Sequence, residues 1–222
     1  AKYHDAKILL LDLDPHANLA IGLGIGPERL ETRVPVLKGE DKITAVIQNT
    51  AIPGLSIIPS NAYLDGLERT PEWGSDLYSH EKVRRSLERL DTRFDYCFID
   101  TPPSLGWLTQ SAFLASEYSV VCAIPEAFSI IALRRLKEFH ESINAYHTIQ
   151  VLGVILSFWD SRGAANQEFL EEIDNSFPHK LFSSKVRRDV AVSRAVLKGM
   201  SVMDYEPNSR AKRSNKIERN YC

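Results

Sequence analysis

The 222-residue sequence predicts an α/β fold with a doubly wound, mostly parallel sheet. Short apolar runs of strand type alternate with segments of helical periodicity, which is typical of parallel strands joined by right-handed crossovers. Two of the apolar runs end in an aspartate and a nearby proline, which stops regular strand pairing. The sequence has no visible repeat, linker or low-complexity tract. We therefore predict a single domain over residues 1–222, with a basic, poorly ordered tail over residues 208–222.

The strands are predicted from short apolar runs that are bounded by charged or turn-forming residues. These runs cover residues 8–13, 55–58, 96–99, 119–124 and 151–158. The runs that begin at residues 8 and 96 are too short for helices and almost wholly apolar. Such runs are typical of strands that are buried on both faces of a parallel sheet.

The helices are predicted where apolar residues recur at helical spacing. These segments cover residues 42–49, 79–90, 108–116, 129–145 and 167–177. In the second of them, Val83, Leu87 and Leu90 fall on one face between charged residues, which indicates an amphipathic packing helix. The glycine-rich segment 22–41 is predicted to be irregular. Its G-x-G-x-G pattern follows an Asp-Pro motif rather than a strand, which argues against a dinucleotide-binding turn.

Composition excludes several classes of function. A net charge of −2 gives no general attraction to nucleic acid, so any such contact must come from a local patch. Cys97 and Cys122 lie in predicted strands and are expected to be core thiols in a reducing cytoplasm. Without a C-x-x-C pattern, the sequence gives little support for zinc or cluster ligation. No apolar run approaches the length of a membrane span.

Carboxylates follow two of the predicted strands. Asp12 and Asp14 come after the first apolar run, and Asp100 closes the run that begins at residue 96. Open α/β sheets bind ligands at the carboxyl ends of their parallel strands. An aspartate that ends a buried strand can hold Mg²⁺, usually through water. The alternative is that each aspartate is an ordinary strand-end cap.

These segments resemble the ParA/Soj branch of the deviant Walker A ATPases, a class that includes MinD and the nitrogenase iron protein. The resemblance begins with D-L-D-P-H-A-N (residues 12–18) and F-I-D-T-P-P-S-L-G-W-L-T (residues 98–109). It continues in the family's order with Ile124-Pro125, G-V-I-L-S-F-W-D-S-R-G (residues 153–163) and K-V-R-R-D-V-A-V-S-R-A (residues 185–195). Five motifs in order are specific, and they imply a P-loop NTPase-like fold.

The phosphate loop of that family has no counterpart in this sequence. No G-x-x-x-x-G-K-[ST] segment occurs in the 222 residues, and the chain starts with Ala rather than Met. By resemblance the loop should stand N-terminal to Lys7, so we expect that the first strand and the loop are missing from this chain. Backbone N–H groups of such a loop supply most of the anion site. The chain alone is therefore expected to bind ATP poorly.

The resemblance implies ATP and Mg²⁺ as cofactors and assigns roles to four residues. Asp14 would orient or deprotonate the attacking water. Asp12 would lie close to the Mg²⁺ shell, and Asp100 would hold the metal through water. Pro102 would begin a second switch segment that senses the γ-phosphate.

Other matched positions concern the base and show departures from the family. His16 stands where ParA proteins usually have glutamine, and it is interpreted as an exposed polar substitute or as a source of pH sensitivity. Ser157 stands where relatives often have an asparagine that contacts the adenine edge. Arg187 and Asp189 match the loop that closes over the base. Asp189 is equally well interpreted as the N-cap of a helix from Ala191 to Leu197.

Basic residues are concentrated late in the chain, where ParA dimers bind DNA without sequence preference. The DNA-contacting residues implied by the resemblance are Arg187, Arg188, Arg194, Lys198, Arg210, Lys212 and Arg213. A phosphate-directed patch of this kind would bind DNA in a strongly salt-dependent manner. The alternative is a solvated, partly disordered tail.

The leading hypothesis is a ParA-type ATPase for plasmid or chromosome partition in the cytoplasm, associated with the nucleoid. ATP would join two subunits into a DNA-binding homodimer, and a centromere-binding ParB-type protein would stimulate hydrolysis. One alternative is a non-catalytic DNA- or partner-binding module without a phosphate loop. A MinD-like membrane ATPase is disfavoured because the C-terminal tail offers only Ile217 and Tyr221 for an apolar face. An iron protein is disfavoured because residues 102–114 contain no cysteine.

Overall fold

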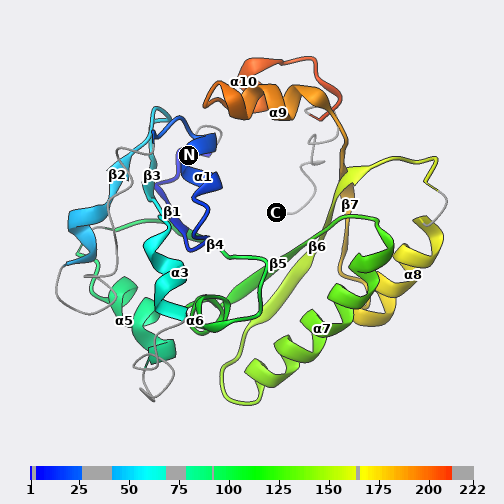
Figure 1. The fold of residues 1–222 in the computed structure, drawn as a ribbon, viewed down its shortest axis with the longest axis horizontal. Helices are drawn as coiled ribbons and strands as arrows, with labels where there is room; N and C mark the ends of the chain where they lie inside the picture. Colours follow the sequence, from blue (N-terminus) through cyan, green and yellow to red (C-terminus); the bar gives the residue numbers. More distant parts are fainter. Residues whose placement is uncertain (2–3, 27–41, 69–78, 92, 164–165, 212–222) are drawn as a thin grey trace. The chain divides into compact units, whose positions relative to one another are not determined.

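The computed structural model describes residues 1, 4–26, 42–68, 79–91, 93–163 and 166–211 (Figure 1). The chain divides into two compact units, Ala1–Ser116 and Glu117–Cys222. In both units helices alternate with mostly parallel strands, so the predicted α/β class is confirmed. Among the described residues, the paired strands form one sheet in each unit. The single-domain organisation stays a prediction.

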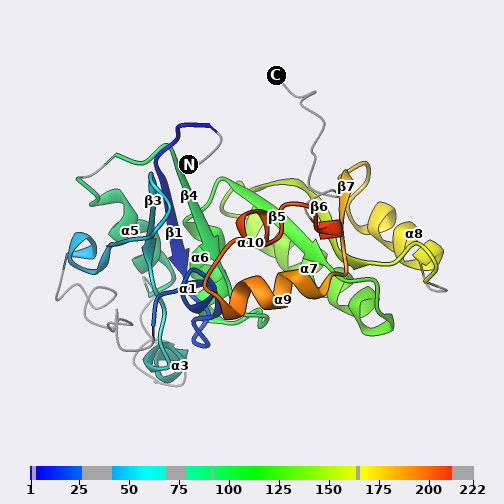
Figure 2. The ribbon, with the colours of Figure 1, turned by 90° about the horizontal axis from the view of Figure 1, so that it is seen from above.

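The first unit contains a four-stranded sheet in the order β2-β3-β1-β4. Strand β1 (Ile8–Asp12) lies between β3 (Leu55–Ile58) and β4 (Tyr96–Asp100) and is parallel to both (Figure 2). Strand β2 (Gln48–Asn49) pairs with β3 in antiparallel orientation. The apolar run that predicted β1 therefore occupies a central strand, which has neighbours on both sides.

Helices and two 3₁₀ turns complete the described part of the first unit. They are α1 (Asn18–Gly22), α3 (Tyr63–Glu68), α5 (Lys82–Glu88), α6 (Trp107–Leu114) and the turns Ile43–Val46 and Ser79–Glu81. The core joins β1 to α5 and α6 through Leu9, Val83 and Leu108, which are all buried. This contact confirms that the amphipathic segment around Val83 packs against the sheet.

The helix predicted over residues 42–49 is wrong in its second half. A 3₁₀ turn ends at Val46, and β2 follows at once. The reason lies in Thr50, whose hydroxyl donates to the carbonyl of Leu55 at 2.9 Å and accepts the Ile52 amide at 3.1 Å. These bonds close a tight turn that returns the chain antiparallel to β2, which a continuing helix would prevent. Most of the segment predicted to be irregular, residues 27–41, lies outside the described residues.

Strand β4 is not buried on both faces, contrary to the prediction. Tyr96 and Phe98 are 62% and 56% exposed. Cys97 in β4 and Cys122 in the second unit are also exposed, so the prediction that they are core thiols is wrong. Among the described residues, β4 and β5 (Tyr118–Ala123) are each paired with a strand on one side only, so they are less enclosed than a central strand such as β1.

The second unit contains a parallel three-stranded sheet in the order β5-β6-β7. Strand β6 (Gln150–Trp159) is central, and β7 (Leu181–Arg187) was not predicted. Helices α7 (Ala127–Asn144) and α8 (Asn166–Ser176) pack on one face of this sheet (Figure 1). Their buried residues Leu133, Phe169 and Ile173 form one core with residues of the sheet such as Val154 and Leu156.

Two further helices follow β7. Helix α9 (Val190–Leu197) begins where the sequence predicted a helix, and α10 (Val202–Tyr205) is a single turn. Among the residues that the structure describes, no helix combines the length and the apolar composition needed to cross a membrane. The predicted basic tail lies mostly outside the described residues, which end at residue 211.

Candidate active site

The carboxyl ends of β1 and β4 bring two aspartates together. Asp12 and Asp100 are paired residues in the parallel register of these strands. Beyond the register, the Leu13 amide donates to the Asp100 carbonyl at 2.8 Å. The sequence predicts carboxylates from two strands at the same sheet edge, and the structure places them there.

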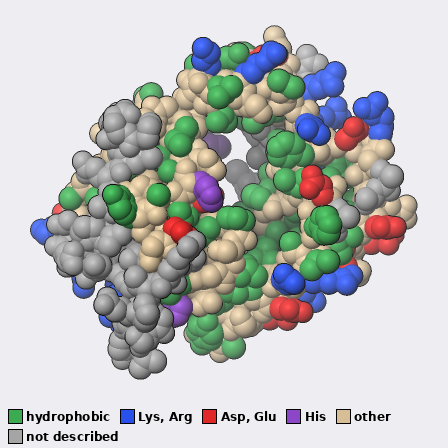
Figure 3. Space-filling model, in the orientation of Figure 1, with side chains coloured by type: hydrophobic (Ala, Val, Ile, Leu, Met, Phe, Trp, Pro, Cys, Tyr) green, Lys and Arg blue, Asp and Glu red, His purple; other side chains and the backbone are tan. Residues whose placement is uncertain are grey.

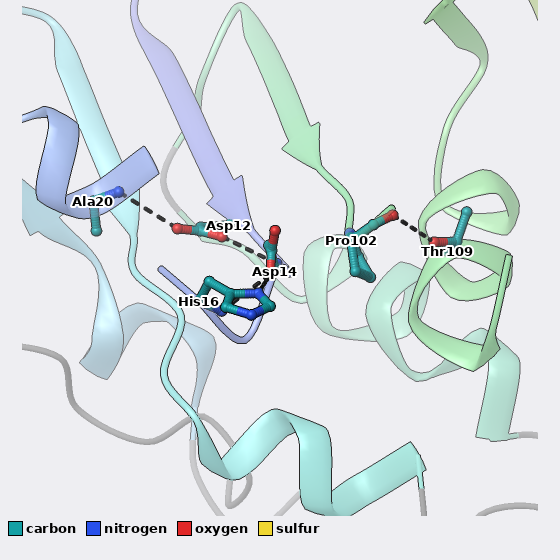
Figure 4. A network of polar contacts seen from close by, with 6 residues as sticks. All are labelled: Asp12, Asp14, His16, Ala20, Pro102 and Thr109. Atoms are coloured by element: carbon teal, nitrogen blue, oxygen red, sulfur yellow. Dashed lines mark hydrogen bonds and ion pairs between the residues drawn. The ribbon is translucent and has the colours of Figure 1, made fainter. Parts of the chain in front are cut away.

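Asp12 is completely buried and organises the segment that follows β1. One of its carboxylate oxygens, Oδ1, accepts the Asp14 amide at 3.1 Å, and Oδ2 accepts the Ala20 amide at 3.4 Å (Figure 4). A buried carboxylate is tolerated only where hydrogen bonds replace its hydration. These bonds therefore tie the turn after β1 and the start of α1 to the end of the strand.

That turn spans Asp14 to Ala17. The Asp14 carbonyl accepts the Ala17 amide at 2.9 Å, which closes a four-residue β-turn. Pro15 occupies the second position, where its fixed φ suits the turn. Ala17 has φ 54°, a left-handed conformation that costs a non-glycine residue about 1–2 kcal/mol. This unusual residue ends the turn and starts α1.

The turn holds Asp14 against His16. Asp14 Oδ1 accepts the His16 amide at 3.0 Å and lies 2.8 Å from the ring nitrogen Nδ1 (Figure 4). An ionised carboxylate only accepts hydrogen bonds, so we assign the ring proton to Nδ1. The Asp14 side chain is 16% exposed and the His16 side chain is 75% exposed. Asp14 is therefore a mostly enclosed carboxylate with an exposed imidazole beside it.

Two influences raise the pKa of Asp100, although its side chain is exposed at the end of β4. Desolvation raises the pKa of Asp100, and the nearby Asp14 charge raises it further, while a backbone hydrogen bond at Thr101 lowers it. Repulsion between carboxylates is the expected result when such groups gather at one sheet edge. A cation bound at this edge would relieve that repulsion.

The donor set of this edge fits Mg²⁺. Magnesium prefers oxygen ligands and is usually held by one or two carboxylates, with water and substrate phosphates filling the other positions. Asp12 and Asp100 supply carboxylates from adjacent strands. The described residues contain no cluster of three or more His, Cys, Asp or Glu that could enclose a metal. A magnesium ion shared with phosphates does not require one.

The segment after β4 is held by a threonine to which the sequence analysis gave no role. Thr109 Oγ1 donates to the Ser104 carbonyl at 2.6 Å and lies 3.4 Å from the Pro102 carbonyl (Figure 4). Thr109 lies in the first turn of α6, which follows an N-cap at Gly106. The sequence signal that could have indicated this role is a threonine that follows Pro102 and Pro103 within a few residues. The predicted second switch therefore starts as an anchored loop.

The predicted base-contacting residues belong to the second unit. Ser157 lies near the end of β6, and Arg187 is the last residue of β7. Asp189 caps α9, since Oδ1 accepts the Ala191 amide at 3.0 Å and Oδ2 accepts the Ala211 amide at 3.2 Å. The capping alternative is thus confirmed, and these backbone hydrogen bonds lower the pKa of Asp189. Nucleotide contacts by Ser157, Arg187 and Asp189 stay predictions.

Most of the predicted DNA-contacting residues are exposed on the second unit. The exposed basic residues are Arg187, Arg188, Arg194, Lys198 and Arg210. They belong to the end of β7, to α9 and to the segment after it, and Figure 3 shows Lys and Arg side chains gathered on the surface over α9. Lys212 and Arg213 lie outside the described residues. The exposed basic residues give this unit a local surface that can attract phosphate groups.

Comparisons with known proteins point to one family. A family model described as an AAA domain matches residues 2–151. The chain is 41% identical over 211 residues to a ParA family protein of Chlamydia muridarum, a match that covers 95% of this chain and 83% of the relative. It is 32% identical over 205 residues to the chromosome partitioning protein ParA of Caulobacter vibrioides, covering 90% and 76%.

Solved structures give the same fold. The chain is similar to apo McdA from Cyanthece with a TM-score of 0.80 at 21% identity, covering 90% of this chain and 81% of that one. It is also similar to a plasmid partition protein from Borrelia burgdorferi bound to AMPPNP, with a TM-score of 0.75 at 20% identity, covering 91% and 84%. At these identities the likeness concerns the fold alone, and it confirms the predicted P-loop NTPase-like architecture.

Proposed function

The chain belongs to the ParA family of partition ATPases, and from this premise we propose that it hydrolyses ATP to drive plasmid or chromosome partition. The observation that carries the proposal is the carboxylate edge of the first unit. Asp12 and Asp100 are paired at the ends of adjacent strands, and the turn after β1 adds Asp14. This arrangement supports the proposal, because phosphoryl transfer to water uses a metal site beside a residue that positions the nucleophile.

The three carboxylates divide into two roles in the proposed reaction. Asp100 and Asp12 would hold Mg²⁺, which supplies charge neutralisation at the phosphates when it is bound. Asp14 accepts a hydrogen bond from the attacking water and so directs its oxygen toward the γ-phosphorus. The new P–O bond forms to this oxygen as one proton of the water passes to Asp14, the bond between the γ-phosphorus and the β–γ bridging oxygen breaks, and ADP and phosphate leave. The anchored loop from Pro102 to Ser104 would sense the γ-phosphate.

The second unit would carry the contacts with base and DNA. Ser157, Arg187 and Asp189 would lie near the base. The exposed basic residues at the end of β7 and on α9 would bind DNA phosphates without sequence preference. We propose that ATP joins two copies into a homodimer that binds DNA, and that a centromere-binding ParB-type protein stimulates hydrolysis. The dimer would then act in the cytoplasm, on the nucleoid.

The test is ATP turnover by the whole protein as cells produce it, measured with and without DNA. The intact mass is measured on the same sample, since the 222 residues correspond to 25.1 kDa and contain no Walker A segment. A greater mass together with magnesium-dependent phosphate release supports the proposal. DNA binding without turnover, by protein of any mass, would contradict it and favour a non-catalytic DNA-binding module.

A further inference from the structure

The contact between the His16 ring and Asp14 is not needed to form the turn after β1. The turn is closed by the bond between the Asp14 carbonyl and the Ala17 amide. The backbone amide of His16 also donates to Asp14 Oδ1 without help from the ring. The ring nitrogen Nδ1 is therefore a second donor to the same oxygen, at 2.8 Å. Any polar or apolar residue at position 16 could supply the backbone bonds, but only a donor side chain can supply this one.

The stability of the fold does not explain this contact either. The His16 side chain is 75% exposed. Interactions of exposed ionisable side chains contribute little to folding, because water competes for both partners. The Asp14 side chain, in contrast, is only 16% exposed, so the ring contacts a mostly enclosed carboxylate. The contact therefore acts on the Asp14 carboxylate and contributes little to the stability of the fold.

The two carboxylate oxygens of Asp14 differ in their partners. Oδ1 has both His16 donors, and among the described residues the Asp14 side chain has no other hydrogen-bond partner. Figure 4 shows one oxygen directed to the ring and the other directed away from it. The terminal torsion of an aspartate is broad, so a free carboxylate would present either oxygen. Two donors on Oδ1 fix the group and leave Oδ2 as the acceptor.

We propose that His16 is a positioning residue for Asp14, and that its Nδ1–H holds Oδ1 so that Oδ2 receives the attacking water. This inference rests on the proposed function, which requires Asp14 but not His16. It assigns a role in turnover to the side chain of His16. A merely exposed polar residue at position 16 would have no influence on turnover.

Two substitutions separate a donor role from a structural one. His16→Leu removes the ring donor and keeps a side chain of moderate size. His16→Asn keeps an N–H donor at the δ position, where the imidazole has Nδ1. We expect His16→Leu to lower kcat about tenfold, the loss typical of one hydrogen bond, with KM for ATP unchanged. His16→Asn should restore kcat to within about threefold of the wild type.

A nitrogen NMR spectrum of the histidine rings tests the contact without turnover. In the wild type the His16 ring should carry its proton on Nδ1, and Asp14→Ala should shift the ring toward the Nε2-protonated form. His179 is an internal reference, because its Nδ1 lies 3.9 Å from Asp174 in the second unit and should not respond to Asp14→Ala. As an activity control, His179→Asn should keep full turnover.

The outcomes separate this inference from the proposed function. If the His16 ring is unchanged by Asp14→Ala, or if His16→Leu turns over ATP at the wild-type rate, the inference is overturned and the proposed function stands. If the wild type shows no turnover, the proposed function fails and the inference fails with it, even where NMR shows the contact. A tenfold loss in His16→Leu, rescue by His16→Asn and a ring that responds to Asp14→Ala together support it.

Discussion

Asp12 and Asp100 are direct register partners at the carboxyl ends of β1 and β4. Four further pairs, from Ile8–Tyr96 to Leu11–Ile99, maintain this register along the strands. Because side chains alternate between the two faces of a sheet, a slip by one residue would turn one carboxylate away from the other. The candidate metal site therefore depends on strand pairing, and the adjacent turn has only to place Asp14.

Asp14→Asn should lower the rate of ATP hydrolysis by at least about 10²-fold, because an amide cannot take a proton from water and is a weaker acceptor than a carboxylate. ATP affinity should stay within a few-fold of the wild-type value, since Asp14 contacts the nucleophile rather than the nucleotide. Phosphate release gives the rate, and a fluorescent ATP analogue gives the affinity.

The matched control for this substitution is Asp95→Asn. Asp95 accepts the Lys7 amide at 2.7 Å, and the residue lies before β4, at the end of the sheet away from the site. An asparagine there keeps an acceptor oxygen for that amide, so turnover should be unchanged. Equal rates for the wild type and Asp14→Asn would exclude Asp14 from the reaction.

Asp100→Asn should stabilise the protein in the absence of nucleotide and metal at pH 7. Since the pKa of Asp100 is raised in the folded state, its ionised form disfavours folding. This penalty is fully present above the folded-state pKa and vanishes below the ordinary value for an aspartate. The gain in Tm should therefore be largest at neutral pH and shrink in acid, as measured by thermal unfolding at several pH values. In the same variant, stabilisation by Mg²⁺ with ATP should be weaker than in the wild type. If Asp100→Asn is instead less stable than the wild type at pH 7 without nucleotide and metal, the ionised Asp100 does not disfavour folding.

The strands that carry the site could be predicted from sequence because each combines an apolar run with a terminal aspartate. Strand β7 lacked such a signal, since Ser183, Ser184 and Lys185 interrupt its apolar residues. Strand β2 is only two residues long, and its pairing depends on the hydrogen bonds of Thr50. Local patterns thus located the central strands but not the edges, which are set by tertiary pairing.

The contact between Asp14 and His16 could not be predicted in the same way. It depends on a turn that ends with Ala17 at φ 54°. Alanine rarely adopts this conformation, so its occurrence in the sequence gives no indication of it. The exposure of Cys97 could not be foreseen either, because an apolar strand has the same pattern at the edge of a sheet as at its centre.

Arg134→Ala should lower the stability of the protein, because it removes the partner of the enclosed Glu172 carboxylate. The Arg134 guanidinium bonds the Glu172 carboxylate at 2.6 Å and 3.0 Å and so joins α7 to α8. The Glu172 side chain is only 9% exposed and also accepts a bond from Ser176. Chemical denaturation measures the loss.

Arg135→Ala is the matched control, because Arg135 is the exposed neighbour on the same helix and its removal should cost less than about 0.5 kcal/mol. Bonding to Arg134 lowers the pKa of Glu172, so this carboxylate stabilises the fold above its ordinary titration range. That contribution should disappear as the pH falls through the lowered value. Equal losses of stability in Arg134→Ala and Arg135→Ala would show that the ion pair between Arg134 and Glu172 does not stabilise the fold.

Replacing both Arg187 and Arg188 with Glu should weaken binding to arbitrary DNA and flatten its salt dependence. Each lost phosphate contact should reduce the slope of log K against log salt concentration by about 0.9. The double substitution Arg89→Glu and Arg93→Glu changes the net charge equally at exposed positions of the first unit, and it should leave binding nearly unchanged. Filter binding at salt concentrations from low to moderate measures the affinity for DNA and its salt dependence in each variant. Unchanged retention of the first variant at low salt would remove the DNA-binding surface from the proposal.

Asp189→Ala should lower Tm by about 2–4 °C, because it removes the N-cap of α9. The carboxylate caps α9 through the Ala191 amide and also accepts the Ala211 amide. Its loss would therefore remove both of these hydrogen bonds. Hydrogen bonding lowers the pKa of Asp189, and the stabilisation it provides should therefore persist above the ordinary aspartate range and vanish as the pH falls through the lowered value. Asp189→Asn keeps a cap acceptor and should recover most of the Tm at neutral pH. If Asp189→Asn recovers the Tm but weakens ATP binding, the residue contacts the nucleotide as well; if it restores both, Asp189 acts only as a cap.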